Sequence, residues 1–556
     1  MRWVLAAFVL CCLAAPTSAQ PSDAQRSNAK SANAKSSQRN TQLGFLDADA
    51  GMVIALDIRQ LAAAHKLATQ LLPTERQTIN LAGLGASAIL GFYPFDSKAW
   101  SASGFDIKAP LLVQVSASRA DASPVRTRAV LKVRAGDKGR RTIERMRLQE
   151  KARLSVAKEP LAPLFVGMAK TPPEDELRGQ LAGAGVFMVA KPRPLGGLLF
   201  AREQGGFIVL DIFAPGSQDF AGVLQIIKRR PEALTVSMPG AEALLEGPVG
   251  IWIRASHLAT TFARTSEGET KRHQACQRIA ALGRTTSIRA VGVQIDIGRK
   301  SVSLSSRWHL RPEARLAEDL RVERAPRVGG QHVLDAQINL RSFGALRDRK
   351  RPAEASSWDA LWAHGKACGQ SSKAYAIAVA WPEILGLFLS EVSVLHPSAT
   401  TAIDSLGGMS ATADQSNGTV SINTEAWVRN PGADIAKGWL RTLFGSEQIT
   451  GDRYQWGLGA IQPYAIDGED GSVIGAGYRK GSRDAALRAT RTNSQRATPA
   501  ATNGSSTLAS LAMKPSKLLR HLPTLPGAEL WKLWKEASAT LTSNASYIEF
   551  RFSVRR

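Results

Sequence analysis

Two histidine–cysteine pairs have spacings that suit metal binding. His273 precedes Cys276 by three residues, and His364 precedes Cys368 by four. On helices, both spacings place the imidazole and the thiol on one face. Imidazole nitrogen and thiolate sulfur are preferred zinc ligands, and two such pairs complete a tetrahedral set. One hypothesis is therefore a zinc site formed by His273, Cys276, His364 and Cys368.

The same cysteines support a simpler prediction. Cys11 and Cys12 lie in an apolar N-terminal segment described below, so only Cys276 and Cys368 would remain in an exported protein. An even number of cysteines in an oxidising compartment favours a disulfide. Closing a loop of this length would stabilise the fold by about 4–5 kcal/mol in the chain-entropy model. We predict this disulfide; the zinc site and a pair of unpaired thiols are the alternatives.

Basic side chains are densest between Arg126 and Lys158, a segment that contains twelve Lys or Arg residues and three acidic residues. A basic strand followed by a basic helix is typical of an anion-binding surface, and an ordinary solvated charged face is the alternative. Aromatic residues for base stacking are absent here, which argues against a specific nucleic-acid site. The candidate anion-binding residues are Arg128, Lys132 and Arg134 on the strand and Arg140, Arg141, Arg145 and Arg147 on the helix.

The chain carries no recognisable catalytic motif. It lacks a nucleophile elbow, a phosphate-binding Gly-Lys-Ser/Thr loop and a His-Glu-x-x-His helix. Asp467, Glu469 and Asp470 alternate with glycines, a pattern more typical of a hairpin turn than of a calcium loop. We therefore predict a protein that is not an enzyme and that needs no cofactor.

The first 19 residues have the order of parts found in a secretory signal peptide. Arg2 supplies the positive charge, residues 3–15 are apolar, and Thr17-Ser18-Ala19 offers a small-residue cleavage site. The apolar run is shorter than the roughly 20 residues that span a bilayer. We predict export to the periplasm or the extracellular space, with no transmembrane span after cleavage.

Residues 20–43 are rich in Ser, Ala, Asn, Gln and basic side chains, and they predict a disordered basic tether. The whole sequence has a formal net charge of +24. Such a charge favours anionic partners, and in an exported protein these are lipid head groups or acidic glycans. The sequence leaves the oligomeric state undetermined.

Short segments with apolar residues at every second position recur along the chain. The clearest are 51–58, 111–116, 249–253, 291–304 and 547–554. Residues 206–213 form a more continuous apolar run, and the Asn417-Gly418 pair predicts a hairpin over 408–428. Stretches 59–72, 137–151, 217–230, 271–282 and 382–395 are predicted helices. This mixture predicts an α+β fold: two mixed or antiparallel sheet domains with helices packed on one face of each.

We place the predicted N-terminal domain at residues 44–325 and the C-terminal domain at 326–556, with a disordered insert at about 481–506. Segments 276–312 and 396–431 share the order helix, hairpin, tryptophan and proline, which suggests a divergent duplication.

Taken together, these features predict an exported, non-catalytic protein of the cell envelope that binds anionic lipid or glycan surfaces. Two alternatives are an exported hydrolase without a recognisable motif and a carrier of lipids or other hydrophobic ligands.

Overall fold

The computed structural model describes thirty-three stretches of the 556-residue chain. These are residues 42–47, 50–62, 65, 92–116, 126–134, 141, 143, 152–154, 160–168, 170–191, 197–213, 220–228, 244, 249–255, 274–278, 281, 287–297, 301–311, 332–338, 363–364, 366–367, 381, 387, 401, 404–416, 419–445, 447–450, 453–456, 461–468, 471–478, 506–518, 534–543 and 547–555. The predicted signal peptide, nearly all of the predicted tether, the predicted domain boundary and the insert up to Ser506 lie outside these residues.

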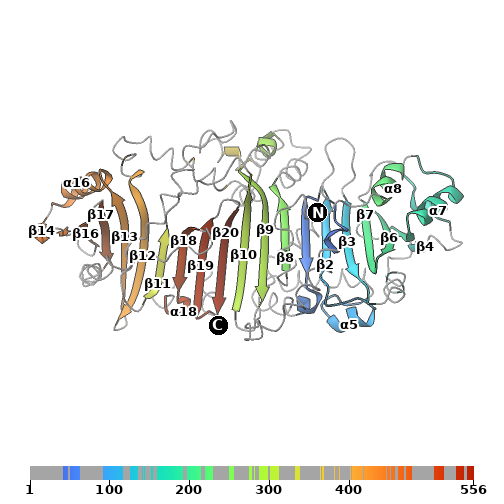
Figure 1. Cartoon of the computed structure of the whole chain (residues 1–556), viewed down its shortest axis with the longest axis horizontal. Helices are drawn as coiled ribbons and strands as arrows, with labels where there is room; N and C mark the ends of the chain where they lie inside the picture. Colours follow the sequence, from blue (N-terminus) through green and yellow to red (C-terminus); the bar gives the residue numbers. More distant parts are fainter. Residues whose placement is uncertain are drawn as a thin grey trace. The chain divides into compact units, whose positions relative to one another are not determined.

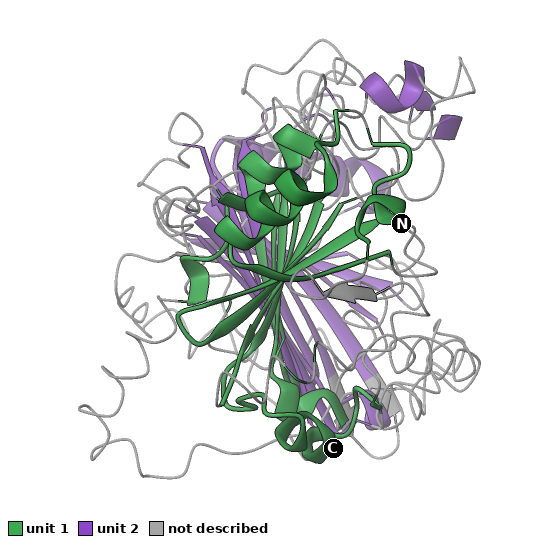
Figure 2. Cartoon of the chain, turned by 90° about the vertical axis from the view of Figure 1, so that its right-hand side faces the viewer, with its two compact units in different colours: residues 1–261, 292–302 green, residues 262–291, 303–556 purple. Residues whose placement is uncertain are grey.

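The chain separates into two compact units, which Figure 2 distinguishes by colour. The first contains residues 1–261 and 292–302, and the second contains residues 262–291 and 303–556. Each unit is built mainly from strands, and every strand pair with a defined register is antiparallel. The hairpin of β9 (Ile288–Ile297) and β10 (Ser301–Leu310) has residues in both units.

The strands of the first unit pair in the order β8-β1-β2-β3-β7-β6-β5-β4 (Figure 1). Their bounds are β1 Met52–Leu56, β2 Leu111–Ser116, β3 Arg126–Lys132, β4 Ala152–Leu154, β5 Val186–Ala190, β6 Leu198–Gln204, β7 Phe207–Phe213 and β8 Val249–Arg254. The short helical elements are η2 Ile58–Gln60, α5 Ser97–Ala102 and η4 Ala162–Leu164, and two longer helices follow as α7 Glu174–Gly183 and α8 Phe220–Lys228.

Both faces of this sheet carry a hydrophobic core. Helix α8 buries Phe220, Val223, Leu224 and Ile227, which recur at helical spacing and pack with Phe200 and Phe213 of the sheet. Burial of each such side chain is worth about 1.5–3 kcal/mol. Trp100 of α5 belongs to a second cluster with Leu199 and Ile208, whose side chains alternate with those of the first cluster along β6 and β7.

The strands of the second unit pair in the order β10-β20-β19-β18-β11-β12-β13-β17-β16-β15-β14 (Figure 1). Their bounds are β11 His332–Ile338, β12 Leu406–Ser416, β13 Thr419–Arg429, β14 Glu447–Thr450, β15 Arg453–Gln455, β16 Ile461–Gly468, β17 Gly471–Tyr478, β18 Ser506–Met513, β19 Glu536–Ser543 and β20 Tyr547–Arg555. The helices are α16 Gly432–Phe444 and the short α18 Pro515–Leu518.

The predicted α+β fold is wrong. The structure is mostly a large antiparallel sheet with few helices, and it does not have two sheets that each carry a helical layer on one face. The error has a physical origin in strands such as β18 and β19, which are rich in Ala, Ser and Thr. Such strands are held by their neighbours and give a weak period-two signal.

Individual elements were predicted more accurately. The predicted strands at 111–116, 206–213 and 547–554 are confirmed as β2, β7 and β20, and the hairpin at 408–428 is confirmed as β12 and β13. The helix at 217–230 is confirmed as α8. The other four predicted helices fall largely outside the described residues. Helices α7 and α16 were not predicted.

Gly475 provides a test of the packing in the second unit. A Cβ atom at this position of β17 would lie 2.4 Å from Cζ of Tyr464 and 2.5 Å from its hydroxyl. We expect Gly475→Ala to lower the free energy of unfolding by about 1–3 kcal/mol, because the buried ring cannot move away without disturbing its neighbours. Urea denaturation followed by circular dichroism measures this loss.

Gly438→Ala is the matched control. An added Cβ at this position of α16 meets no atom within 4 Å, so the better helix propensity of alanine should raise stability by roughly 0.5–1 kcal/mol. A Gly475→Ala protein as stable as the wild type would contradict the close packing of Tyr464 on β17.

Candidate functional site

The register of the second unit places apolar side chains on one face of the sheet. Successive residues of a strand point to opposite faces, so the paired residues define each face. We call this surface the apolar face. Its members are Ile461 of β16, Ile474 and Tyr478 of β17, Ile422 and Ala426 of β13, Met409 and Ala411 of β12, Ala336 and Ile338 of β11, Ala509 and Leu511 of β18, Ala539 and Leu541 of β19, and Phe550 and Phe552 of β20.

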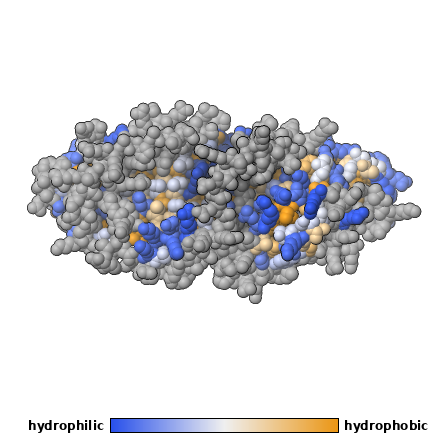
Figure 3. Space-filling model, turned by 60° about the horizontal axis from the view of Figure 1, so that its bottom comes forward, coloured by the Kyte–Doolittle hydropathy of each residue, from blue (hydrophilic) through white to orange (hydrophobic). Residues whose placement is uncertain are grey.

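This face is partly open to solvent. Ile338 and Met409 are directly opposite each other on β11 and β12, and their exposed fractions are 37% and 41%. Ile461 and Tyr478 face each other on β16 and β17, and each is 46% exposed. All four exposed large apolar side chains on described strands lie on the apolar face. Figure 3 shows apolar side chains reaching the described surface beside hydrophilic ones.

The opposite face is polar, and on β12, β13 and β16 it is also buried. We call it the polar face. Ser410, Thr412, Asn423 and Glu425 are each less than a tenth exposed, and Tyr464 is fully buried. At β12, β13 and β16 the sheet therefore reverses the usual arrangement of antiparallel sheets, in which the apolar face is covered and the polar face meets water. Neighbouring exposed apolar side chains on one face of a sheet are typical of a surface that binds a partner.

A hydrogen-bonded carboxyl group lies at the centre of the polar face. The Tyr464 hydroxyl donates to Oε1 of Glu425 at 2.5 Å, and Nδ2 of Asn423 donates to the same oxygen at 3.1 Å. Oε2 of Glu425 is buried and hydrogen-bonds to no described group. Burial raises the pKa of Glu425 more than these two bonds lower it. The pKa of Tyr464 is raised as well, by burial and by the adjacent carboxylate.

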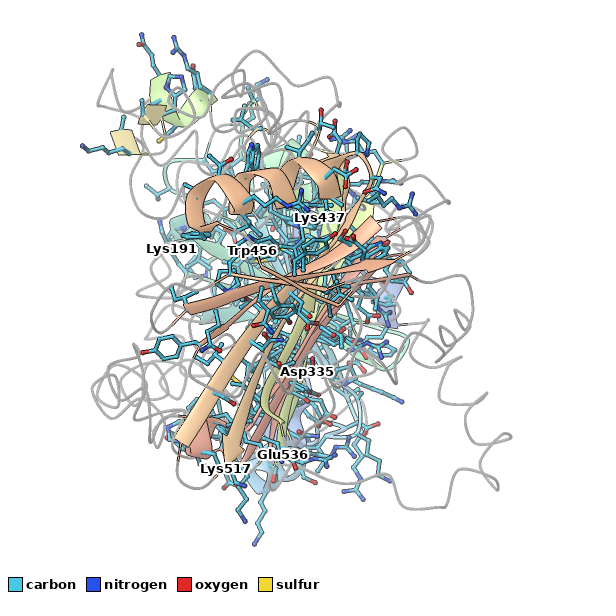
Figure 4. The ribbon with its side chains drawn as sticks, turned by 90° about the vertical axis from the view of Figure 1, so that its left-hand side faces the viewer. Lys191, Asp335, Lys437, Trp456, Lys517 and Glu536 are labelled. Atoms are coloured by element: carbon cyan, nitrogen blue, oxygen red, sulfur yellow. The ribbon has the colours of Figure 1, made fainter. Side chains whose placement is uncertain are left out.

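Helix α16 lies over one end of the apolar face (Figure 4). Nζ of Lys437 is 2.7 Å from Oδ1 of Asp467 and packs over the ring of Tyr454, and the Ser472 hydroxyl donates to the same aspartate oxygen. Burial lowers the pKa of Lys437, but its bonds to Asp467 and Asp434 outweigh that effect and raise it. The acidic, glycine-rich segment that contains Asp467 thus lies at the turn between β16 and β17, as predicted from the sequence. Asp467 also holds α16 to the sheet through its ion pair with Lys437.

Helix α16 exposes two large apolar side chains beside polar ones, since Asp434, Arg441 and Thr442 are exposed as well. Trp439 and Leu443 are one turn apart on the helix, and their exposed fractions are 43% and 69%. Arg441 lies between them in sequence and packs over Tyr454. The helix thus presents tryptophan and leucine to the surroundings while its lysine holds it to the sheet.

The predicted basic cluster does not form one exposed surface. Arg128 is fully buried, and its Nε donates to Asp211 at 2.7 Å, so it cannot meet an anion in solvent. This expectation failed because Arg128 lies on the strand face that the core covers. Lys132 is half-buried, 3.5 Å from Asp106, and Arg134 and Arg141 are exposed. Arg140, Arg145 and Arg147 lie outside the described residues.

The structure brings together the neighbourhoods of the two predicted disulfide cysteines. Cys276 is buried, and Arg278 donates from Nη1 to Nε2 of His364 at 3.2 Å. Burial and this guanidinium lower the pKa of His364. His273 and Cys368 lie outside the described residues. Among the described residues, no three His, Cys, Asp or Glu side chains gather as a metal site would require.

Comparisons with known proteins identify no family. No family model matches the chain, and no curated protein matches it. Two solved structures align weakly, crystal forms IV and III of TP0453. The two alignments cover 43% and 42% of the present chain and 94% of the TP0453 chain. The sequence identity is 8% in both, and the TM-scores are 0.24 and 0.23. A likeness at this level carries no argument about fold or function.

Sequence reasoning missed both the apolar face and Glu425. The face is assembled from eight strands, each of which contributes one or two apolar residues, so no single segment reveals it. Glu425 did leave a signal, since a carboxylate occurs inside the predicted strand 419–428 at the same parity as Asn423. No helix in the described part of the chain has the length and apolar character needed to cross a membrane.

The Glu425 site predicts a pH dependence. Because the pKa of Glu425 is raised in the folded protein, its contribution to stability is present below the unfolded pKa and is lost as pH rises through the folded pKa. We expect Glu425→Gln to remove that loss, so that the variant exceeds the wild type in stability on the alkaline side. Urea denaturation over a pH series measures the difference.

Glu536→Gln, the same substitution at an exposed position of β19, is the matched control. Parallel pH profiles for wild type and Glu425→Gln would show that Glu425 is ionised equally in both states, contrary to the prediction.

Proposed function

We propose that this is an exported, non-catalytic protein of the cell envelope that binds anionic lipid through its second unit. The observation that carries the proposal is the partly exposed apolar face, on which Ile338, Met409, Ile461 and Tyr478 meet solvent. Lipid chains supply the apolar contact that such a face would gain. Each Å² of apolar surface removed from water is worth roughly 25 cal/mol.

An acidic glycan fits this face less well. Sugar hydroxyls and carboxylates need hydrogen-bond donors and acceptors, whereas the strands present aliphatic and aromatic side chains there. The polar residues that could bind a sugar, such as Asn423 and Glu425, are buried on the other face and occupied with one another. The apolar face thus favours lipid over glycan.

Charge complements the apolar contact. The formal net charge of +24 attracts a protein to anionic head groups, an interaction worth about 1 kcal/mol for each basic residue near the surface. Trp439 and Leu443 on α16 add an aromatic and an aliphatic side chain of the kind found at lipid–water interfaces. The export signal predicted in residues 1–19 would deliver the protein to the envelope.

A carrier that extracts single lipids is the second candidate, since the same face would hold acyl chains in solution. It differs from the first in stoichiometry: a carrier copurifies with about one lipid and transfers it between vesicles, while a surface-binding protein stays on the membrane. We propose no hydrolase, because the described serines that donate to a carboxylate, Ser472 to Asp467 and Ser305 to Glu549, share that carboxylate with a lysine or an arginine.

The apolar face predicts the effect of two substitutions. We expect the double variant Ile338→Ser, Met409→Ser to bind vesicles of phosphatidylglycerol and phosphatidylcholine about tenfold more weakly, because two exposed apolar side chains are lost from one contact. Val166→Ser is the matched control, an exposed apolar residue of the first unit. Vesicle co-sedimentation measures the affinity, and equal binding by all three proteins would overturn the proposal.

The contribution of basic charge to membrane binding is tested by varying the salt concentration. Binding of the wild type to these vesicles should fall as salt rises, because exposed charges are screened over about 10 Å at 0.1 M ionic strength. Binding to vesicles of phosphatidylcholine alone should be weak at every salt concentration. Retention that does not change with salt would contradict a role for the basic charge.

We further propose the Cys276–Cys368 disulfide. The contact between Arg278 and His364 supports it, because these residues are two and four positions from the cysteines. We expect the intact mass of the exported protein to rise by two hydrogens on reduction, and Cys368→Ser to lower stability by about 2–5 kcal/mol. Two alkylatable thiols in unreduced protein would contradict the bridge, and zinc released on denaturation would support the metal alternative.

A further inference from the structure

A cluster of five charged side chains is buried in the first unit. Arg126 and Arg128 of β3, Arg202 of β6, Asp211 of β7 and Asp47 of the segment before β1 are each at most 7% exposed. Arg128 and Asp211 are direct partners across β3 and β7. The cluster therefore sits on one face of the sheet, beneath residues 42–47.

The two aspartates are fully engaged. Arg128 donates two hydrogen bonds to Asp211, from Nε at 2.7 Å and from Nη2 at 3.1 Å. Asp47 forms an ion pair with Arg126. It also accepts hydrogen bonds from Nη1 of Arg128 at 3.0 Å and from Nε2 of Gln114 at 2.9 Å. The pKa of Asp211 is lowered because these guanidinium groups outweigh the effect of its burial.

Arg202 is different. Its Nε lies 3.7 Å from Oδ2 of Asp211, within ion-pair range but beyond the normal length of a hydrogen bond. Nε and Nη2 of Arg202 are buried and hydrogen-bond to no described group. These two atoms form the same edge that Arg128 uses to hold Asp211. Burial lowers the pKa of Arg202, as expected for a cation removed from water without a full partner.

The charges among these five residues do not balance. Three guanidinium groups stand against two carboxylates, which leaves one positive charge in excess. A buried charge without a hydrogen-bonded partner costs several kcal/mol, and a hydrophobic residue of similar volume would avoid that cost. The planar guanidinium edge matches two oxygens of a phosphate group.

We propose that Arg202 binds a phosphate group through its Nε and Nη2 edge, next to the Asp211–Arg128 pair. The bound anion would balance the excess charge and supply acceptors to Nε and Nη2 of Arg202. This site lies in the first unit and does not depend on the apolar face of the second. The phosphate belongs either to free phosphate or to a lipid head group, and both present the same oxygens.

Thermal unfolding of the full mature protein tests the site. We expect inorganic phosphate, compared with chloride at equal ionic strength, to raise the unfolding temperature by roughly 3–5 °C at several times the dissociation constant. Arg202→Met should abolish this shift. Arg202→Lys should lose most of it, because an ammonium keeps the charge but lacks the two-point fork. Far-ultraviolet circular dichroism at low temperature confirms that both variants are folded.

A second arm identifies the source of the phosphate. Short-chain phosphatidic acid below its micellar concentration replaces inorganic phosphate, with the matching phosphatidylcholine as reference. A shift with inorganic phosphate supports a site for the free anion, and a shift with phosphatidic acid alone supports a lipid head group. No shift with either, or equal shifts in wild type and Arg202→Met, would overturn the proposal.

The experiments test the lipid-binding face and the Arg202 phosphate site independently of each other. Loss of vesicle binding in the Ile338→Ser, Met409→Ser variant concerns the second unit and leaves the phosphate shift intact if the Arg202 site exists. Conversely, Arg202→Met should retain vesicle binding even when the phosphate shift disappears.

Discussion

The alternation of side chains along paired strands is the constraint on which the second unit depends. Once Ser416 pairs with Thr419, every residue of β12 and β13 is assigned to a face, and the pairings of β17, β11 and β18 extend that assignment across the sheet. Met409 and Ile338 then share one face, and Glu425 is placed on the other. A shift of one residue would bury the apolar set and expose the carboxyl group.

Buried polar groups in both units are stabilised by partners contributed from distant parts of the sequence. Glu425 depends on Tyr464, which reaches it from β16, and the close approach of that ring requires a glycine at 475. In the first unit, Arg128 and Asp211 are 83 positions apart and form a two-point ion pair. The free-energy cost of removing these groups from water offsets much of what the interactions gain. Their main effect is therefore to favour one arrangement of the strands over others, and their net contribution to stability is small.

The sequence predicted strands well where large apolar residues alternate or run together, as in β2 and β7. It predicted the β12–β13 hairpin from the Asn417-Gly418 pair at its turn. It did not predict the sheet as a whole, because alanine- and serine-rich strands such as β18 resemble no particular element when read alone. Arg128 was assigned to a surface, although Asp211 within the apolar run of β7 was a sign that a cation would be buried beside it.

The most direct test of the lipid-binding face is a photoreactive amino acid placed at position 409 or at position 512. Met409 lies on the apolar face, and Ala512 is exposed on the polar face of neighbouring strands. On vesicles that contain phosphatidylglycerol, illumination should crosslink lipid to position 409 and leave position 512 unmodified. Equal crosslinking at both positions, or crosslinking at position 512 alone, would contradict binding through the apolar face.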